Sequence, residues 1–544
     1  MRGLMMDMPL LLPGLLRHAA KFHGATEIVS RAEEGGIHRY TYADAAARTG
    51  RLAHALVELG LKPGDRVGTL AWNGYRHFEL YFAVPGAGFV CHTINPRLFA
   101  EQITFIVNDA EDRFIFVDLS FLKLLESVAP NLPKVEGYVI MTDREHMPVT
   151  TLPNALCYED LVAGRPEHFA WPDLDERTAS GMCYTSGTTG NPKGVLYSHR
   201  STMLHSMACV RADVFGLSTR DTLMPVVPMF HVNSWGLPYA AAMTGAKLVL
   251  PGGKLDGASL AELIATEGVT ISAGVPTVWL ALLDHADAAQ VGLPTLERVL
   301  VGGSAVSASL IGRFAARGVR TVHAWGMTET SPVAASSVLD RRHDSLTPDQ
   351  KTAIQLKQGF ALCGADLRIV DHAGTEVPWD GKTHGVLEVR GPWICSGYYN
   401  NDDRSAFSAD GWFATGDVCT MTPDGYMEIV DRTKDVIKSG GEWISSIALE
   451  NIAIGHPAVR EAAAIGRPDD KWGERPRLVL ALKPGAQLTA AEMRAFLEPK
   501  IAKWWMPDDL VIVEELPHTA TGKLLKMELR RLYGGRDVKD AIKL

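Results

Sequence analysis

The segment Tyr184-Thr-Ser-Gly-Thr-Thr-Gly-Asn-Pro-Lys-Gly194 lies between an apolar run and the apolar residues Val195 to Tyr197. Its glycines allow backbone N–H groups to turn toward phosphate oxygens, its hydroxyl groups donate further hydrogen bonds, and Lys193 adds a positive charge. No glycine precedes a Gly-Lys-Ser/Thr triplet at the spacing of a Walker A loop, which argues against a P-loop NTPase. The segment predicts a nucleotide-phosphate loop, with a flexible hairpin loop as the alternative.

Short apolar runs followed by amphipathic stretches occur on both sides of this loop. Residues 66–71 form such a run before a helix-like stretch at 77–82, and residues 297–301 run into a glycine pair before helical spacing at 307–317. A buried strand, a tight turn and a helix make up the usual ligand-binding geometry of open α/β sheets. The pattern predicts an α/β fold.

The C-terminal third of the chain changes in character. Residues 381–426 are rich in Gly, Asp and aromatic residues and predict antiparallel strands joined by turns, that is, a β-subdomain. Residues 431–441 are charged and end in a glycine pair, where a chain can bend without burying polar backbone, so the main domain boundary is expected there. In the remainder, Ser445 is expected to cap one helix, and Thr489 with Glu492 predicts a capping box for another. Apolar strand candidates follow at 462–465 and 477–482.

Composition bounds the class of protein. The chain has 544 residues, enough for three or four domains or subdomains at roughly 150 residues each. With 46% hydrophobic and 22% charged residues it has globular usage, and a net charge of −9 gives no overall basic surface for nucleic acid. Seven separated cysteines without a C-x-x-C pair indicate neither disulfides nor a zinc site. Without a signal peptide or an apolar stretch long enough to span a membrane, the sequence predicts a cytoplasmic protein.

Six further motifs follow the loop in order. They are Pro228-Met-Phe-His231, Gly302-Gly-Ser-Ala305, Trp325-Gly-Met-Thr-Glu-Thr330, Gly411-Trp-Phe-Ala-Thr-Gly-Asp417, Asp431-Arg-Thr-Lys-Asp435 and Thr519-Ala-Thr-Gly-Lys523. Together with the loop, they resemble the adenylate-forming superfamily of acyl-CoA synthetases, luciferases and peptide-synthetase adenylation domains. The resemblance extends from near the N-terminus to the end of the chain, and seven motifs at compatible spacing are far more specific than one.

The resemblance implies an α/β fold, α+β overall, with two parts. A large N-terminal domain (1–431) would comprise two α/β subdomains and a β-subdomain, and a hinge (432–441) would join it to a small mobile α+β domain (442–544). The family chemistry converts a carboxylic acid with Mg²⁺-ATP to an acyl-adenylate and then transfers the acyl group to a thiol, here that of coenzyme A. The implied partners are the acid, ATP and CoA, and the implied assembly is a homodimer.

The resemblance also implies site residues. Lys523 would bridge the substrate carboxylate and the α-phosphate, Glu329 and Thr185 would hold Mg²⁺, and His231 would act beside them; nearby Lys526 is a control for charge alone. Nucleotide and CoA contacts are implied for Thr185, Ser186, Gly187, Thr188, Thr189, Gly190, Lys193, Gly302, Gly303, Ser304, Ala324, Trp325, Gly326, Met327, Thr328, Asp417, Arg432, Lys438, Gly440 and Gly441. Acyl contacts are implied for His231, Val232, Trp235, Gly302 and Pro332, and a hinge role for Lys434 and Asp435. Asp417 would bind the ribose hydroxyls.

The residues after Phe230 indicate which kind of acid is activated. Amino-acid-activating relatives place an Asp there, whereas this chain has His231-Val-Asn, so amino-acid activation is not expected. Trp235 would shorten the pocket if it points inward, but would say nothing of chain length if it points into the core. The segment around it resembles most the branch of medium-chain fatty acyl-CoA synthetases and 3-methylmercaptopropionate:CoA ligases, and favours the latter substrate. A medium-chain fatty acid, a luciferase-like oxygenation and an inactive nucleotide-binding regulator are the alternatives.

Overall fold

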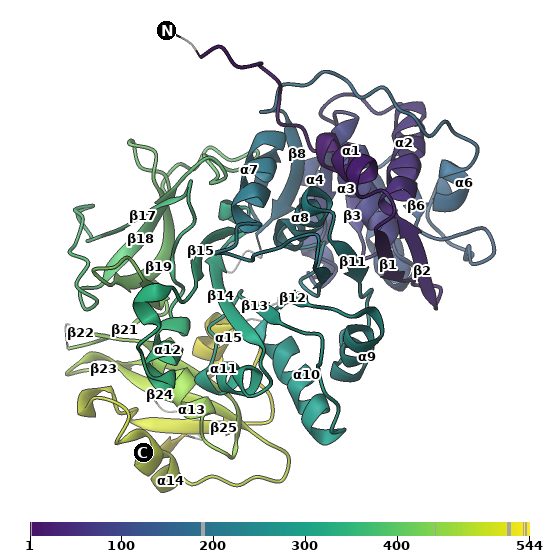
Figure 1. The fold of residues 1–544 in the computed structure, drawn as a ribbon. Helices are drawn as coiled ribbons and strands as arrows, with labels where there is room; N and C mark the ends of the chain where they lie inside the picture. Colours follow the sequence, from purple (N-terminus) through teal and green to yellow (C-terminus); the bar gives the residue numbers. More distant parts are fainter. Residues whose placement is uncertain (2, 186–190, 441, 519–523, 537, 539–540) are drawn as a thin grey trace.

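The computed structural model describes all residues except 2, 186–190, 441, 519–523, 537 and 539–540. The described strands form four sheets, of seven, nine, four and six strands. In Figure 1 the N-terminal third (purple to blue) and the central third (teal) lie on one side of the molecule, and the green and yellow sheets lie on the other. The mixed α/β character predicted from the sequence is confirmed.

The seven-stranded sheet carries the predicted phosphate loop. In its order β7-β6-β5-β3-β4-β8-β9, neighbours are parallel except the last pair, whose connection is the loop. Its strands are β3 (Arg66–Leu70), β4 (Val90–Thr93), β5 (Asp112–Val117), β6 (Gly137–Ile140), β7 (Ala155–Cys157), β8 (Ala179–Tyr184) and β9 (Gly194–Ser198). Its helices are α2 (Tyr42–Glu58), α3 (Tyr75–Gly86), α4 (Ala100–Ala110), η1 (Leu119–Phe121), α5 (Leu122–Val128), η2 (Ala129–Asn131), α6 (Tyr158–Val162) and α7 (His199–Cys209).

The nine-stranded sheet contains β13, the strand that ends at the glycine turn of residues 302–304. Its order is β16-β15-β14-β13-β12-β10-β11-β1-β2, with parallel strands from β14 to β1 and antiparallel pairs at both edges. Its strands are β1 (Glu27–Arg31), β2 (Ile37–Thr41), β10 (Thr222–Pro225), β11 (Lys247–Leu250), β12 (Ile271–Gly274), β13 (Arg298–Val301), β14 (Arg320–Gly326), β15 (Val333–Ser337) and β16 (Phe360–Ala361). Its helices are α1 (Pro13–Phe22), η3 (Val232–Gly236), α8 (Leu237–Thr244), α9 (Gly257–Glu267), α10 (Pro276–Ala288), α11 (Ala308–Ala315), η4 (Thr328–Thr330), η5 (Arg341–His343) and α12 (Pro348–Gln355).

The two remaining sheets follow in sequence. The antiparallel one comprises β17 (Asp366–Val370), β18 (Gly385–Arg390), β19 (Phe413–Met421) and β20 (Met427–Arg432), which confirms the strands predicted within 381–426. The last one comprises β21 (Ile437–Ser439), β22 (Glu442–Ile444), β23 (Val459–Asp469), β24 (Gly473–Leu482), β25 (Asp509–Val513) and β26 (Ile542–Lys543), with α13 (Ser446–Ile454), α14 (Ala490–Leu497), η6 (Lys503–Trp505) and α15 (Lys526–Tyr533). The chain passes from one sheet to the other between Arg432 and Ile437; the domain limits at 431 and 441 stay a prediction.

Short-range signals in the sequence account for many element ends. The side chain of Ser445 accepts a hydrogen bond from the backbone of Ala448 and caps α13, and Thr489 with Glu492 forms the predicted capping box of α14. These bonds satisfy N–H groups that the first turn of a helix leaves without a partner. Every helix in the described part of the chain is too short or too polar to cross a membrane.

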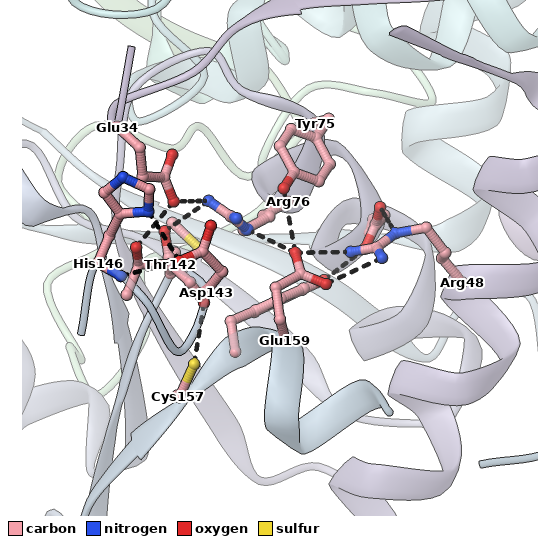
Figure 2. Close-up of polar contacts among 12 residues, drawn as sticks. Glu34, Arg48, Tyr75, Arg76, Thr142, Asp143, His146, Cys157 and Glu159 are labelled. Carbon is pink, nitrogen blue, oxygen red and sulfur yellow. Dashed lines mark hydrogen bonds and ion pairs between the residues drawn. The ribbon is translucent and has the colours of Figure 1, made fainter. Parts of the chain in front are cut away.

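A network of ion pairs fixes the helices of the seven-stranded sheet to one another (Figure 2). Glu159 of α6 accepts two hydrogen bonds of 3.0 Å from Arg48 of α2 and one of 2.8 Å from Arg76 of α3. Arg76 also binds Glu34 at 2.7 Å, and Arg48 binds the fully buried Glu79 at 2.7 Å. The network links α2, α3 and α6, and removing one member would be destabilising because it would leave a charge without compensation in a region of low exposure.

Candidate active site

The predicted phosphate loop connects the antiparallel strands β8 and β9, and its described end residues, Thr185 and Lys193, are bonded to each other. Thr185 donates its N–H to the carbonyl of Lys193 at 2.9 Å, and Lys193 donates its own to Oγ1 of Thr185 at 3.1 Å. The Lys193 ammonium lies 3.3 Å from Asp403 and 4.8 Å from the centre of the Tyr398 ring. Asp403 and Tyr398 thus hold the Lys193 ammonium at the end of the loop, next to β9. The predicted phosphate contacts Ser186, Gly187, Thr188, Thr189 and Gly190 lie outside the described residues.

Glu329, the predicted metal ligand, is a buried carboxylate with 6% exposure in η4. Its Oε1 accepts a 2.7 Å hydrogen bond from the hydroxyl of Tyr398, whose pKa is raised mainly by burial and further by the charge of Glu329. The backbone of Cys395 binds the carbonyl of Glu329 at 2.8 Å. A carboxylate and the hydroxyl of Thr185 are oxygen donors of the kind that Mg²⁺ takes, together with phosphates and water. The donor set fits this ion.

Asp417, the predicted ribose ligand, has 2% exposure in β19. Its Oδ2 accepts the indole N–H of Trp325 at 3.0 Å, and its Oδ1 pairs with Nε of Arg432 at 2.6 Å. The side chain of Arg432 remains 40% exposed, so this ion pair contributes little to stability by itself. The structure thus unites three predicted nucleotide residues from three separate motifs.

The glycine turn after β13 meets the next strand and the ring of Trp235, one of the predicted acyl residues. Gly302 is buried, whereas Gly303 (φ +81°) and Ser304 are exposed. A Cβ on Gly302 would lie 2.8 Å from the carbonyl oxygen of Ala324 and 2.9 Å from Cη2 of Trp235. Only glycine fits here without displacing its neighbours. The turn lies at the carboxyl ends of parallel strands, where open α/β sheets bind ligands.

The motif after β14 folds back on itself. A Cβ on Gly326 would lie 1.7 Å from the carbonyl oxygen of Pro332, so this position also requires glycine. Met327 donates its N–H to the same oxygen at 3.2 Å, and Thr328 accepts a 2.7 Å hydrogen bond from the hydroxyl of Tyr197. Pro332 and the predicted nucleotide residues 326–328 therefore form one closed loop beside β9.

The residues from Pro228 to Gly236, called here the 228–236 segment, form the other side of Gly302. From Val232 to Gly236 the backbone makes a left-handed turn, with φ between +46° and +73°. Four of these five residues are not glycine, and such a backbone costs about 1–2 kcal/mol for each of them. Trp235 is 8% exposed and belongs to the hydrophobic core, while the edge of its ring reaches Gly302. The ring is thus buried and still borders the site.

The remaining predicted residues lie on the C-terminal side. Asp435 pairs with Arg530 of α15 at 2.6 Å, and Lys434 precedes it in the turn between β20 and β21. Trp472 covers Gly440 (φ +63°), and both line a cavity of about 520 Å³. Within the described residues, no hydrogen bond or ion pair joins the exposed Lys438 or Gly440 to the residues of β13 and β14. Gly441 and Lys523 lie outside the described part.

Several residues of the site carry no signal in the sequence. Tyr398 binds Glu329 from 69 positions away, and Asp403 binds Lys193 from 210 positions away. Lys526, taken from the sequence as a control for charge, instead has a side chain with only 10% exposure that pairs with Glu450 at 2.8 Å, because α15 packs on the C-terminal sheet. It is therefore unsuitable as a control.

The chain matches family models over most of its length. The model described as AMP-binding enzyme matches residues 15–399, and the model described as AMP-binding enzyme C-terminal domain matches residues 448–523. The first match alone covers more than half of the chain and includes the phosphate loop, the 228–236 segment and the glycine turn. The protein belongs to the AMP-binding enzyme family.

Individual proteins resemble the chain along nearly all of its length. It is 51% identical to the 3-methylmercaptopropionyl-CoA ligase of Ruegeria pomeroyi (99% of each chain covered) and 50% identical to the medium-chain-fatty-acid–CoA ligase of Ectopseudomonas oleovorans (98% of each). Among solved structures, the anthranilate CoA ligase AuaEII in complex with anthranoyl-AMP superposes with a TM-score of 0.86 at 27% identity, covering 96% of this chain and 98% of that one. The predicted family and fold are confirmed.

Proposed function

We propose that the protein is an ATP-dependent, AMP-forming acid:CoA ligase that activates a short or medium acyl carboxylate. One observation carries the proposal: β14 joins the nucleotide and acyl sides of the site. The indole of Trp325 binds Asp417, while the neighbouring carbonyl of Ala324 lies against Gly302, which the ring of Trp235 borders. A nucleotide on Asp417 and an acid beside Trp235 would thus meet at this strand. Relatives that are named CoA ligases and are 50% and 51% identical in sequence to this chain support the same reaction.

The residues divide the chemistry between them. The acid's carboxylate would attack the α-phosphate of ATP, with pyrophosphate as the leaving group, and the thiol of CoA would then displace AMP from the acyl-adenylate. Residues 185–190 and Lys193 would hold the phosphates, and Lys523 would neutralise charge on the carboxylate and the α-phosphate as they approach. Thr185 and Glu329 would hold Mg²⁺, which supplies further charge neutralisation at the phosphates when bound.

A rotation of the C-terminal domain would separate the two half-reactions. Residues 432–441 would be the hinge, with Lys434 and Asp435 as its pivots, between a domain ending at 431 and one beginning at 442. After adenylation, the face that carries Lys438, Gly440 and Gly441 would replace Lys523 at the site and border the pantetheine chain of CoA. The placement of Gly440 beside a cavity supports this role.

For the acid we propose 3-methylmercaptopropionate, with a medium-chain fatty acid as the second candidate. Relatives of nearly equal identity carry both names, so identity alone does not choose between them. The bulk of Trp235 at Gly302 favours the shorter acid. A homodimer and a cytoplasmic location remain part of the proposal, and the seven free thiols support a reducing compartment.

The test is AMP formation from Mg²⁺-ATP that depends on both CoA and acid. The acids compared are 3-methylmercaptopropionate and straight chains from acetate to palmitate, with amino acids as controls. A maximum at the thioether, or at its near-isosteres butyrate to hexanoate, supports the proposal, and a maximum at octanoate or beyond assigns the second candidate. Light emission would indicate the luciferase-like alternative. Absence of pyrophosphate release with every acid would indicate the nucleotide-binding regulator.

A further inference from the structure

Asn73 lies in the loop between β3 and α3 of the seven-stranded sheet, but it makes four hydrogen bonds to β10 and to the loops after β10 and β11 of the nine-stranded one. Its Nδ2 donates to the carbonyls of Pro225 at 2.7 Å and Val227 at 3.0 Å, and its Oδ1 accepts from the N–H of Met229 at 2.7 Å. Its own carbonyl accepts from the N–H of Gly252 at 3.1 Å. The side chain has 2% exposure. The nitrogen of the side-chain amide donates twice and its oxygen accepts once, which fixes the orientation of the amide.

The backbone that Asn73 binds leads directly into the 228–236 segment. Met229 is also held from the other side, because the hydroxyl of Tyr81 on α3 donates to its carbonyl. The next residue, Phe230, packs edge-to-face on Trp72, the neighbour of Asn73, at 5.5 Å between ring centres. His231 follows immediately. The position of this histidine and of the left-handed turn after it is therefore set by side chains of the other sheet.

The first turn of α3, the helix that follows Asn73, is anchored by hydrogen bonds to Glu159. Tyr75 and Arg76, two and three residues after Asn73, both bind Glu159, as Figure 2 shows. Asn73 before α3 and Tyr81 on α3 bind the same residue, since one accepts from the N–H of Met229 and the other donates to its carbonyl. The start of α3 is thus bound to the ion-pair network, and Asn73 and Tyr81 bind the 228–236 segment.

We infer that Asn73 is a positioning residue for acid binding, which fixes the 228–236 segment, and with it Trp235 against Gly302, through the backbone of residues 225–229. The inference rests on the proposed function, since it assigns the 228–236 segment to the acid. In the described part of the chain, the hydrogen bonds of Asn73 go to residues 225–229 and to Gly252, and none goes to Asp417, Thr185 or Lys193. Loss of its bonds displaces the acyl side of the site and leaves the nucleotide side in place.

The test is Asn73→Asp, which keeps the acceptor for Met229 and replaces the donating group by an oxygen that faces two carbonyls. The KM for the acid rises roughly tenfold to a hundredfold, as expected for a misplaced binding group, while the KM for ATP stays within about twofold. A buried carboxyl has a raised pKa, and its protonated form donates one hydrogen bond. The acid KM of the variant, relative to wild type, therefore recovers in part as the pH is lowered from 8 to 6.

Asn108→Asp is the matched control, because it makes the same chemical change at a partly exposed asparagine that donates one bond to Asn131. Tyr81→Phe is the second variant if Asn73→Asp does not fold; it removes one bond to Met229 and raises the acid KM about threefold. Equal rises in both KM values, or an unchanged acid KM in folded Tyr81→Phe, overturn the inference.

Failure of the proposed function is distinguishable from failure of this inference. If wild-type protein forms no AMP with any acid, the ligase assignment falls, and hydrogen exchange reports on Asn73 directly. Peptides that cover residues 225–236 then exchange faster in Asn73→Asp than in Asn108→Asp if Asn73 fixes this backbone. Equal exchange in the two variants overturns its positioning role.

Discussion

Replacing Trp235 by alanine should lengthen the acids that the enzyme accepts. The ring is 8% exposed, and Cη2 lies 2.9 Å from the position that a Cβ on Gly302 would take. Truncation removes the indole from the side of the site that the glycine turn borders. The left-handed backbone at position 235 imposes the same constraint on both side chains, so the change in the pocket is chiefly the lost ring.

The magnitude follows from the apolar surface that a longer chain would bury. Each methylene group that leaves water contributes about 0.8 kcal/mol, which corresponds to roughly a fourfold gain in kcat/KM. Room for about three methylene groups therefore raises kcat/KM by roughly 60-fold for an acid three carbons longer than the wild-type optimum. The lost packing costs about 3–5 kcal/mol of unfolding free energy if the space stays empty.

The assay is kcat/KM for AMP formation with straight acids from butyrate to dodecanoate, for wild type, Trp235→Ala and Trp235→Phe. The optimum should move to longer acids in the alanine variant and by a smaller step in the phenylalanine variant. Urea denaturation measures the loss of stability in parallel. A loss of stability without any shift of the optimum would refute the reasoning, because the ring would then be part of the core alone.

Three other changes test the site and the fold. Lys523→Ala should lower acyl-AMP formation at least about a hundredfold while ATP binding, measured by calorimetry, persists; unchanged acyl-AMP formation would remove this lysine from the mechanism. Tyr398→Phe removes the hydrogen bond to Glu329 and should raise the Mg²⁺ concentration for half-maximal activity about tenfold; an unaltered Mg²⁺ curve contradicts this. Burial lowers the pKa of His205 from 6.5 to about 3. Below pH 6.5 the unfolded chain therefore binds a proton at this residue, whereas the folded protein does not. The free energy of unfolding should fall by up to about 1.4 kcal/mol per pH unit from this group as the pH drops from 6 to 4, and His205→Gln should remove that share of the slope in denaturant titrations.

Local patterns in the sequence were sufficient for much of the fold. The run at 66–71 and the helix after it became β3 and α3, and the run ending at Gly302 became β13 followed by α11. These elements are set by hydrophobic period, glycine turns and capping residues, all of which act over a few positions. The strands at 462–465 and 477–482 were likewise found as parts of β23 and β24.

Contacts between distant residues could not be read in the same way. Asn73 binds backbone groups 152 to 156 positions away, and no spacing in the sequence joins it to Met229. The left-handed turn runs against the propensity of Val232, whose branched side chain disfavours positive φ. The packing of Phe230 and the hydrogen bonds around residues 225–229 override that local preference. Tertiary contacts of this kind have no signature in a single sequence.

The left-handed turn at Val232–Gly236 also narrows the evolutionary routes by which this enzyme can change its acid. Any residue at position 235 has to accept a φ of +56°, a region that favours Gly and Asn and penalises β-branched side chains. Valine or isoleucine would replace the indole ring by a smaller apolar side chain, but a β-branched residue is strained at this positive φ. Related enzymes with deeper pockets should therefore retain unbranched residues or glycine at this position, or change other side chains of the pocket.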